Sequence, residues 1–395
     1  MTEPGFGPAH PTSEQTGERR LAIQFTGSGS EYFRIWIVNL LLTIVTLSLY
    51  HPWAKVRRLR YFYGNTLVDG HALDFHGDPK KMLRGYLLVG LMAIVYGAAG
   101  KLSPTAGFVA FLIIAAIWPA LLKASMQFRL ANTSWRGLRF RFRGDVAGAY
   151  KALLPLFIPS LLLIGMVAMI PDQLHPPAWY LPAFGLTMLG TFLLLPLLLW
   201  KLKKYLHDHY SLGQVQTELK ASVGSFYGVF LKTFGVAILS SIVLGIVIAV
   251  IAGAGIAAMF VSGGKNGNVQ MVAMFVGFAV VIVMMIGAQL LPRPYFDSRM
   301  QNLLWGQTLA EKLQFKSELR FAPLFWLTIK NWFLMIVTLG LYWPFAKVAF
   351  ARMHLEAVSV ATRLNIDELH EQLRLADGDA AGDAAGDLFG VDIGL

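Results

Sequence analysis

Long apolar stretches separated by short polar ones dominate the chain and predict a protein of membrane-crossing helices. Most of the apolar stretches have about 20 residues, which is enough to cross roughly 30 Å of hydrocarbon. There are eight: Tyr32–Tyr50, Met82–Gly100, Thr105–Lys123, Gly148–Ile170, Trp179–Trp200, Ser225–Val261, Val269–Leu291 and Phe321–Tyr342. We therefore expect an all-α polytopic membrane fold with about eight hydrophobic segments.

The connections between these segments alternate in character and predict how the chain is oriented. Four are longer and basic: Lys55–Arg84, Gln127–Lys151, Lys201–Lys220 and Arg293–Arg320. Three are short and carry few bases: Lys101–Pro104, Pro171–Ala178 and Ser262–Asn268. Because positive loops normally remain in the cytoplasm, the pattern predicts three central helical hairpins that open toward it. The first and last segments flank these hairpins.

Five short segments alternate apolar and polar residues with period two, which is typical of strands with one buried face. They are Ile23–Gly27, Leu73–Gly77, Phe140–Gly144, Thr217–Ala221 and Leu313–Ser317. Each ends in a small residue that would permit a tight turn, and Asn65, Asn132 and Asn302 lie upstream as predicted turn residues. The five strands are either independent linkers or one small sheet, and we favour the sheet because isolated strand pairs are barely stable in water.

A second repeat links the two ends of the apolar region. Residues 39–60 and 331–352 align without gaps and are identical at 13 of 22 positions, including a Leu-Tyr-x-Pro-aromatic-Ala-Lys motif. Proline disfavours helix at the preceding residue and can begin a new helix. We therefore predict helix breaks at Tyr50, Pro52, Tyr342 and Pro344. A basic interfacial helix would follow each break, carrying Lys55, Arg57, Arg58 and Arg60 in the first copy and Lys347 and Arg352 in the second.

The two repeats leave the course of the end segments open. If both segments cross the membrane, they cross in opposite directions, and one strand lies on the far side. If each enters and returns, all five strands stay on one side. We favour the second arrangement, through a shallow, re-entrant or strongly tilted segment.

Composition supports the membrane class and divides the chain into three regions. The 395 residues are 55% hydrophobic and 14% charged, against about 25% charged in soluble domains. Residues 1–22 are polar and predicted to be disordered, 23–360 form one membrane domain with units starting near 23, 73, 140, 217 and 313, and 361–395 form an acidic, disordered tail. The net charge is +11, but the bases lie beside membrane segments, so we expect anionic membrane lipids and a protein partner rather than nucleic acid.

These residues are similar to a known family. The stretch from Phe25 to Thr66, with its Leu-Tyr-x-Pro motif, and the later Asp69-Gly70-His71 and Phe75-His76-Gly77 resemble the bacterial inner-membrane proteins typified by YjgN. The resemblance covers roughly residues 23–360, and the acidic tail departs from it. It implies a location in the bacterial cytoplasmic membrane and no mechanism, since the family is a domain of unknown function.

Polar residues inside the end segments are the candidate site, because they are costly in hydrocarbon unless they face protein or water. Asn39 and Asn331 match across the repeat, as do Thr46 and Thr338. They either line a shared polar pathway or bond to neighbouring helices. Lys330 either contacts an anion, with Glu31 or Glu318 as partner, or extends to the interface.

No other motif predicts chemistry. His207-Asp208-His209 has two potential metal ligands, but a solvated polar segment explains it more simply. We expect no catalytic residue, no metal and no cofactor. The leading hypothesis is transport, or the handling of lipids or small molecules, across or within the membrane. The alternative is a non-transport scaffold whose basic cytoplasmic face recruits a protein or anionic lipid, and a third is an intramembrane enzyme.

Overall fold

The computed structural model describes residues 19–170, 175–213, 215–261, 287–311 and 313–362, with the single positions 277 and 371. Most of the predicted segment Val269–Leu291 and of the two predicted terminal regions lies outside these residues. The first strand begins at Arg19 and the last ends at Thr362, so strands occupy the edges of both terminal regions.

Ten strands form a closed antiparallel barrel, which corrects the predicted all-α class and the predicted five strands. The strands are β1 (Arg19–Phe25), β2 (Thr66–Val68), β3 (His71–Phe75), β4 (Thr133–Trp135), β5 (Leu138–Phe142), β6 (Tyr210–Leu212), β7 (Val215–Leu219), β8 (Thr308–Ala310), β9 (Leu313–Ser317) and β10 (Val358–Thr362). They follow one another around the ring in chain order, and β10 returns to pair with β1. The even strands up to β8 have three residues each, too few for a period-two pattern to be recognised in the sequence.

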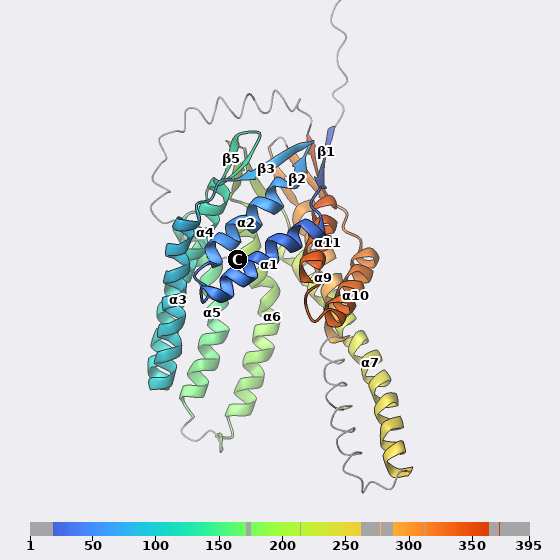
Figure 1. Cartoon of the computed structure of the whole chain (residues 1–395). Coiled ribbons are helices and arrows are strands. Elements are labelled where there is room, and N and C mark those ends of the chain that lie inside the picture. The colour runs from blue at the N-terminus through green and yellow to red at the C-terminus, as the bar shows by residue number, and fades with distance from the viewer. Residues whose placement is uncertain are drawn as a thin grey trace, which may run out of the picture.

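Among the residues that the structure describes, helices connect the strands in five units, each with two helices between its two strands, and these helices extend from the same end of the barrel (Figure 1). The helices are α1 (Gly29–Val45), α2 (His51–Gly64), α3 (Pro79–Leu102), α4 (Pro104–Ala131), α5 (Val146–Ala168), α6 (Tyr180–His207), α7 (Val223–Val261), α9 (Pro292–Gly306), α10 (Phe321–Val337) and α11 (Trp343–Glu356). The two strands of each β-hairpin belong to neighbouring units. Two of these hairpins turn through left-handed pairs, Asp69-Gly70 and Arg136-Gly137, which match the twist of antiparallel strands.

The helices also close into a ring beneath the barrel. Within each unit the two helices pack on each other, and the second helix packs against the first helix of the next unit. The series ends with α11 packed against α1, so the first and last units are neighbours in both rings. The five units therefore have approximate fivefold symmetry.

Apolar side chains from almost every strand fill the barrel. Leu21, Trp135 and Val360 are buried, and side chains from five further strands pack against them. A cluster with contributions from around the whole ring can lie only inside it. The Trp135 indole also donates a hydrogen bond to the Val68 carbonyl at 3.2 Å. The barrel interior is therefore a packed core, as in other small barrels.

The last residue of each odd strand anchors the barrel to the helices. Phe25, Phe75 and Phe142 are each buried among residues of three helices, a different set for each, and Leu219 is buried in the same way in the fourth unit. The small residue two positions later is required by packing: a Cβ at Gly77 would lie 2.5 Å from the Phe75 ring. Packing against the anchor ring, rather than the tight turn predicted from the sequence, is therefore the main reason for these glycines.

In the fifth unit, the structure places the anchor position two residues later than the predicted repeat does. The backbone nitrogens of residues 26, 76, 143, 220 and 318 donate equivalent hydrogen bonds across the ring. The anchor of the fifth unit is therefore Ser317, not Phe315, and the residue two positions later is the buried Leu319. Large anchors pair with Gly and the small anchor pairs with Leu, so the volume of each pair is roughly conserved. Asn302, predicted as a turn residue, lies in α9.

Five helices are long and apolar enough to cross a membrane: α3, α4, α5, α6 and the first 28 residues of α7. They coincide with the second to sixth predicted segments. The first and last segments form α1 and α10 instead, which have 17 residues each and would measure about 26 Å. Each turns back toward the barrel through a second helix, so all strands lie at one end of the molecule, as in the enter-and-return arrangement.

Candidate functional site

The two short hairpins, α1–α2 and α10–α11, form the candidate site, and we call them the end hairpins. Each first helix ends five residues before the tyrosine of the predicted break, and the second begins at His51 or Trp343, with proline in its first turn. The connecting turns expose large apolar side chains: Leu47 is 88% exposed and Leu339 is 93% exposed. Leucines this exposed at a turn are suited to lipid rather than water.

Thr46 and Thr338 form hydrogen bonds that stabilise these turns. Each hydroxyl donates to a carbonyl one helical turn earlier, Leu42 at 2.7 Å and Leu334 at 2.6 Å. Each also accepts a hydrogen bond at 3.0 Å from the nitrogen of Tyr50 or Tyr342. The structure thus places both threonines in matching structural roles at the tips.

Asn39 and Asn331 are buried, but the structure does not bring them into one pathway. The Asn39 amide nitrogen lies 3.5 Å from the Ala54 carbonyl of its own hairpin. Helix α11 packs against both α1 and α10 and lies between them (Figure 1). Asn331 is 0% exposed, and among the described residues neither its side-chain oxygen nor its nitrogen has a partner; the Asn39 oxygen also has none there. Unpaired buried amides are costly and call for an explanation.

Lys330 lies on the exposed side of α10, next to the buried Asn331. In the part of the chain that the structure describes, it forms no ion pair with Glu31 or Glu318. The Tyr61 hydroxyl instead lies 3.3 Å from the Glu31 carboxylate. The side chain is therefore placed to extend along the helix surface.

The six predicted interfacial bases have different environments. Arg57 and Arg60 are exposed on α2, Arg58 is half-buried and Lys55 is buried. Lys347 is exposed on α11, 6.0 Å from the centre of the Trp343 ring.

Arg352 closes the ring of units, a role that the sequence did not reveal. Its guanidinium donates to the Gly27 carbonyl at 2.9 Å, which joins the last unit to the first. Equivalent carbonyls receive equivalent bonds elsewhere: Trp200 donates to Ala221 at 2.8 Å, and Asn302 donates to Leu319 at 3.0 Å. The signal was the repeat itself, because all three acceptors occupy the same position of their units.

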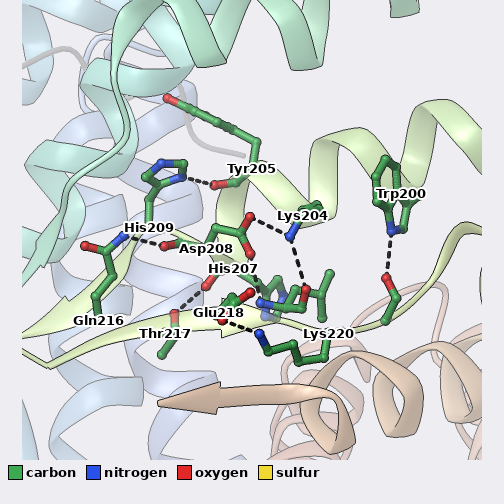
Figure 2. A network of polar contacts seen from close by, with 12 residues as sticks. Trp200, Lys204, Tyr205, His207, Asp208, His209, Gln216, Thr217, Glu218 and Lys220 are labelled. Carbon is green, nitrogen blue, oxygen red and sulfur yellow. Dashed lines mark hydrogen bonds and ion pairs between the residues drawn. The ribbon is translucent and has the colours of Figure 1, made fainter. Parts of the chain in front are cut away.

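The His207-Asp208-His209 segment is a structural junction (Figure 2). His207 Nδ1 lies 3.0 Å from the Thr308 hydroxyl, whereas His209 Nδ1 lies 2.6 Å from the Tyr205 carbonyl. Asp208 accepts from the Leu219 nitrogen at 2.8 Å and pairs with Lys204 at 2.9 Å. The histidines thus bind different partners, and the described residues contain no group of three potential metal ligands.

The closed ring of units, the apolar helices and the exposed apolar tips define an integral membrane protein with a barrel-shaped domain at one end. The chain belongs to the family described as "Bacterial protein of unknown function (DUF898)", whose model matches residues 20–388. It is thus a YjgN-like inner-membrane protein of unknown function, as the sequence resemblance predicted.

The similar curated proteins carry the same name. The chain is 32% identical over 143 residues to "Inner membrane protein YjgN" of Salmonella typhimurium, a match that covers 36% of each chain. It is 31% identical over 144 residues to the Escherichia coli K12 protein of that name, covering 36% of this chain and 35% of the other. The matched region is thus about a third of those relatives' length. No solved structure matches the chain.

Proposed function

We propose that the protein handles lipids or other small amphipathic molecules within the inner membrane, and that the end hairpins do the work. The observation that carries this proposal is Asn331, a fully buried amide that has no partner in the part of the chain that the structure describes, on a helix whose tip is exposed and apolar. An amide that a ligand satisfies only when it is bound would explain why the cost of its burial is tolerated.

The proposed topology follows from charge and length. The central helices α3 to α7 would cross the membrane, and the end hairpins would enter only the leaflet nearest the barrel. The basic connections 55–84, 127–151, 201–220 and 293–320 all lead through the barrel end, which supports a cytoplasmic barrel. The short connections would then face the periplasm.

The filled barrel favours handling at the side of the molecule over transport along its axis. Leu21, Trp135 and Val360 occupy the interior, so a polar solute has no evident route through the barrel. Lipid could instead approach the end hairpins laterally, where α1 and α10 are too short to cross the bilayer upright.

The test is lipid movement in proteoliposomes made with the full-length protein. We expect faster transbilayer movement of a fluorescent phosphatidylglycerol than in protein-free vesicles. Asn39→Leu with Asn331→Leu should abolish most of that acceleration, while removal of the unpaired Asn331 amide should stabilise the fold by about 1 kcal/mol. The matched control Gln24→Leu with Gln314→Leu, on the exposed barrel surface, should keep the wild-type rate.

Two results would contradict the proposal in different ways. If the asparagine variant moves lipid at the wild-type rate, the end hairpins are not the site. If wild-type protein does not accelerate transbilayer lipid movement, the proposal that the protein moves lipid is wrong. The alternative function, a scaffold that presents the rigid barrel and its basic surface to a partner, would then be favoured, because a packed barrel suits a docking platform.

A further inference from the structure

A cavity of about 470 Å³ lies between α7 and α9, and none of its lining residues belongs to the end hairpins. Ser225, Gly228, Val229 and Lys232 line it from α7, and their spacing of three, four and seven residues places them on one helix face. Tyr295 and Arg299 line it from α9, one turn apart. The volume is within the range of small-ligand sites.

Two cations of this cavity have no acidic partner in the described residues. The Arg299 guanidinium lies 5.4 Å from the centre of the Tyr295 ring, which orients it without neutralising its charge. The nearest acid in sequence, Asp297, is two residues away on the helix and contacts Arg293 at 3.9 Å instead. The cavity is thus positively charged and has hydroxyl donors at Ser225 and Tyr295.

Small residues leave room between the two charges. A Cβ added to Gly228 would meet no atom within 4 Å. Beside the cavity, the rings of Phe230 and Phe296 pack edge to face at 5.4 Å and hold α7 against α9. The opening is therefore built into a packed helix pair.

The depth of Lys232 points to the kind of ligand. It lies nine residues into the candidate span that begins at Val223, about 14 Å along the helix. Helical side chains lean toward the helix N-terminus, which brings its ammonium back toward the barrel end, where a headgroup layer would lie. An exposed cation at this depth is costly unless an anion accompanies it.

We propose that this cavity binds a phosphate-bearing anion, either the headgroup phosphate of an anionic phospholipid or a free phosphate ester. The Arg299 fork would bind two phosphate oxygens, Lys232 would supply a second charge, and Ser225 and Tyr295 would donate hydrogen bonds. This inference does not depend on lipid handling by the end hairpins.

The test measures ligand-dependent thermal stability of the full-length protein in neutral detergent. One arm raises the mole fraction of phosphatidylglycerol against phosphatidylcholine. The other adds glycerol 3-phosphate or inorganic phosphate to micelles that contain phosphatidylcholine alone. We expect stabilisation in at least one arm, and the responding arm identifies the source of the phosphate.

Variants then locate the effect. Lys232→Gln with Arg299→Gln should weaken the response about tenfold or more, because two charge-assisted contacts are lost. Gly228→Leu should weaken it similarly by filling the cavity, while it keeps both charges and improves helix propensity. The matched control Arg84→Gln with Lys151→Gln removes two exposed cations from α3 and α5 and should respond like wild type.

Other results overturn the inference. If neither arm stabilises wild-type protein, the cavity has no phosphate ligand. If both pocket variants respond like wild type, or the control loses as much as they do, the stabilisation is a general effect of surface charge. Neither result depends on the rate of lipid movement, so this inference and the proposed function can fail separately.

Discussion

At the scale of single residues, the two copies of the end-hairpin turn show where backbone strain is tolerated. Ser48 has a φ of +72° and occupies the position that Gly340, with a φ of +89°, holds in the other copy. Only glycine adopts this conformation without steric cost. No atom within 4 Å would crowd a side chain at Gly340, so the difference between the copies is conformational.

We therefore predict opposite effects for reciprocal substitutions. Ser48→Gly should raise the free energy of unfolding by about 1 kcal/mol, and Gly340→Ser should lower it by about the same amount. Thermal unfolding followed by tryptophan fluorescence would measure both. If both substitutions changed the free energy of unfolding in the same direction, side-chain contacts rather than the backbone φ would determine the stability of these turns.

His354 makes the contact between α11 and α9 sensitive to acid. Its Nδ1 lies 2.5 Å from the Gln301 side-chain oxygen, and the Gln301 amide donates to the His354 carbonyl at 2.9 Å. Burial lowers the pKa of His354, an effect that the nearby Asp297 carboxylate partly opposes. Below the unfolded-state pKa of about 6.5, the unfolded chain binds more protons at this site than the folded protein.

Stability should therefore fall as the pH drops from 7.5 through about 6.5. The measurement is the unfolding temperature at pH 7.5 and at pH 5.5, compared with His354→Gln, which keeps a polar side chain but cannot titrate. We expect the variant to lose less stability over this interval. The same loss in both proteins would mean that other groups dominate the acid response.

At the scale of elements, each unit pairs its anchor residue with the residue two positions later. The size of the anchor decides whether a side chain larger than glycine fits at that second position. Phe75 is followed by Gly77, and its ring lies where a Cβ would be. In the fourth unit the smaller anchor Leu219 is followed by Ala221, and both are buried. The sizes of the anchor residue and of the residue two positions later therefore change together from unit to unit within one chain.

We therefore predict that a smaller anchor compensates for a larger residue two positions later. Gly77→Ala should destabilise the protein by about 1 to 3 kcal/mol, because the added methyl group overpacks the junction. Phe75→Leu alone leaves a cavity, whereas the double variant copies the fourth unit and should be more stable than the sum of the two changes predicts. Chemical denaturation of the four proteins measures this coupling, and strict additivity would contradict it.

Sequence reasoning found the elements that carry a local signal and missed those that depend on distant partners. Period-two alternation identified the odd strands, and proline within a repeat that aligns without gaps located the breaks near Pro52 and Pro344. The three-residue strand Thr66–Val68 was too short to recognise, so neither the number of strands nor closure was predicted. The same limit applies to the cavity: Lys232 lies on α7 and Arg299 lies on α9, and no local pattern in the sequence joins them.

At the scale of the whole molecule, the barrel places all ten strands at one end, and this can be tested because the chain has no cysteine. Exposed residues on the five odd strands can be changed one at a time: Gln24→Cys, Asp74→Cys, Arg139→Cys, Gln216→Cys and Gln314→Cys. A membrane-impermeant thiol reagent applied to intact cells should label none of them before lysis.

The control is Ala178→Cys, an exposed position at the far end of the helices between α5 and α6. It should react in intact cells, which shows that the reagent reaches the periplasmic face. Labelling of Gln24→Cys alone would place β1 on the opposite side of the membrane from the other strands. That result would be incompatible with a closed barrel in the membrane-inserted protein.

The pairing of β1 with β10 sets the order in which the protein can be completed during synthesis. Strand β1 leaves the ribosome first, and β2 covers one of its edges as soon as the first hairpin is made. Its other edge, together with the Gly27 carbonyl that Arg352 will bind, remains open until the last strand has been translated. An open edge can pair with another chain, so a nascent protein that stops before Val358 is an aggregation hazard in the cell. The final strand thus closes the barrel and covers the last open edge of β1.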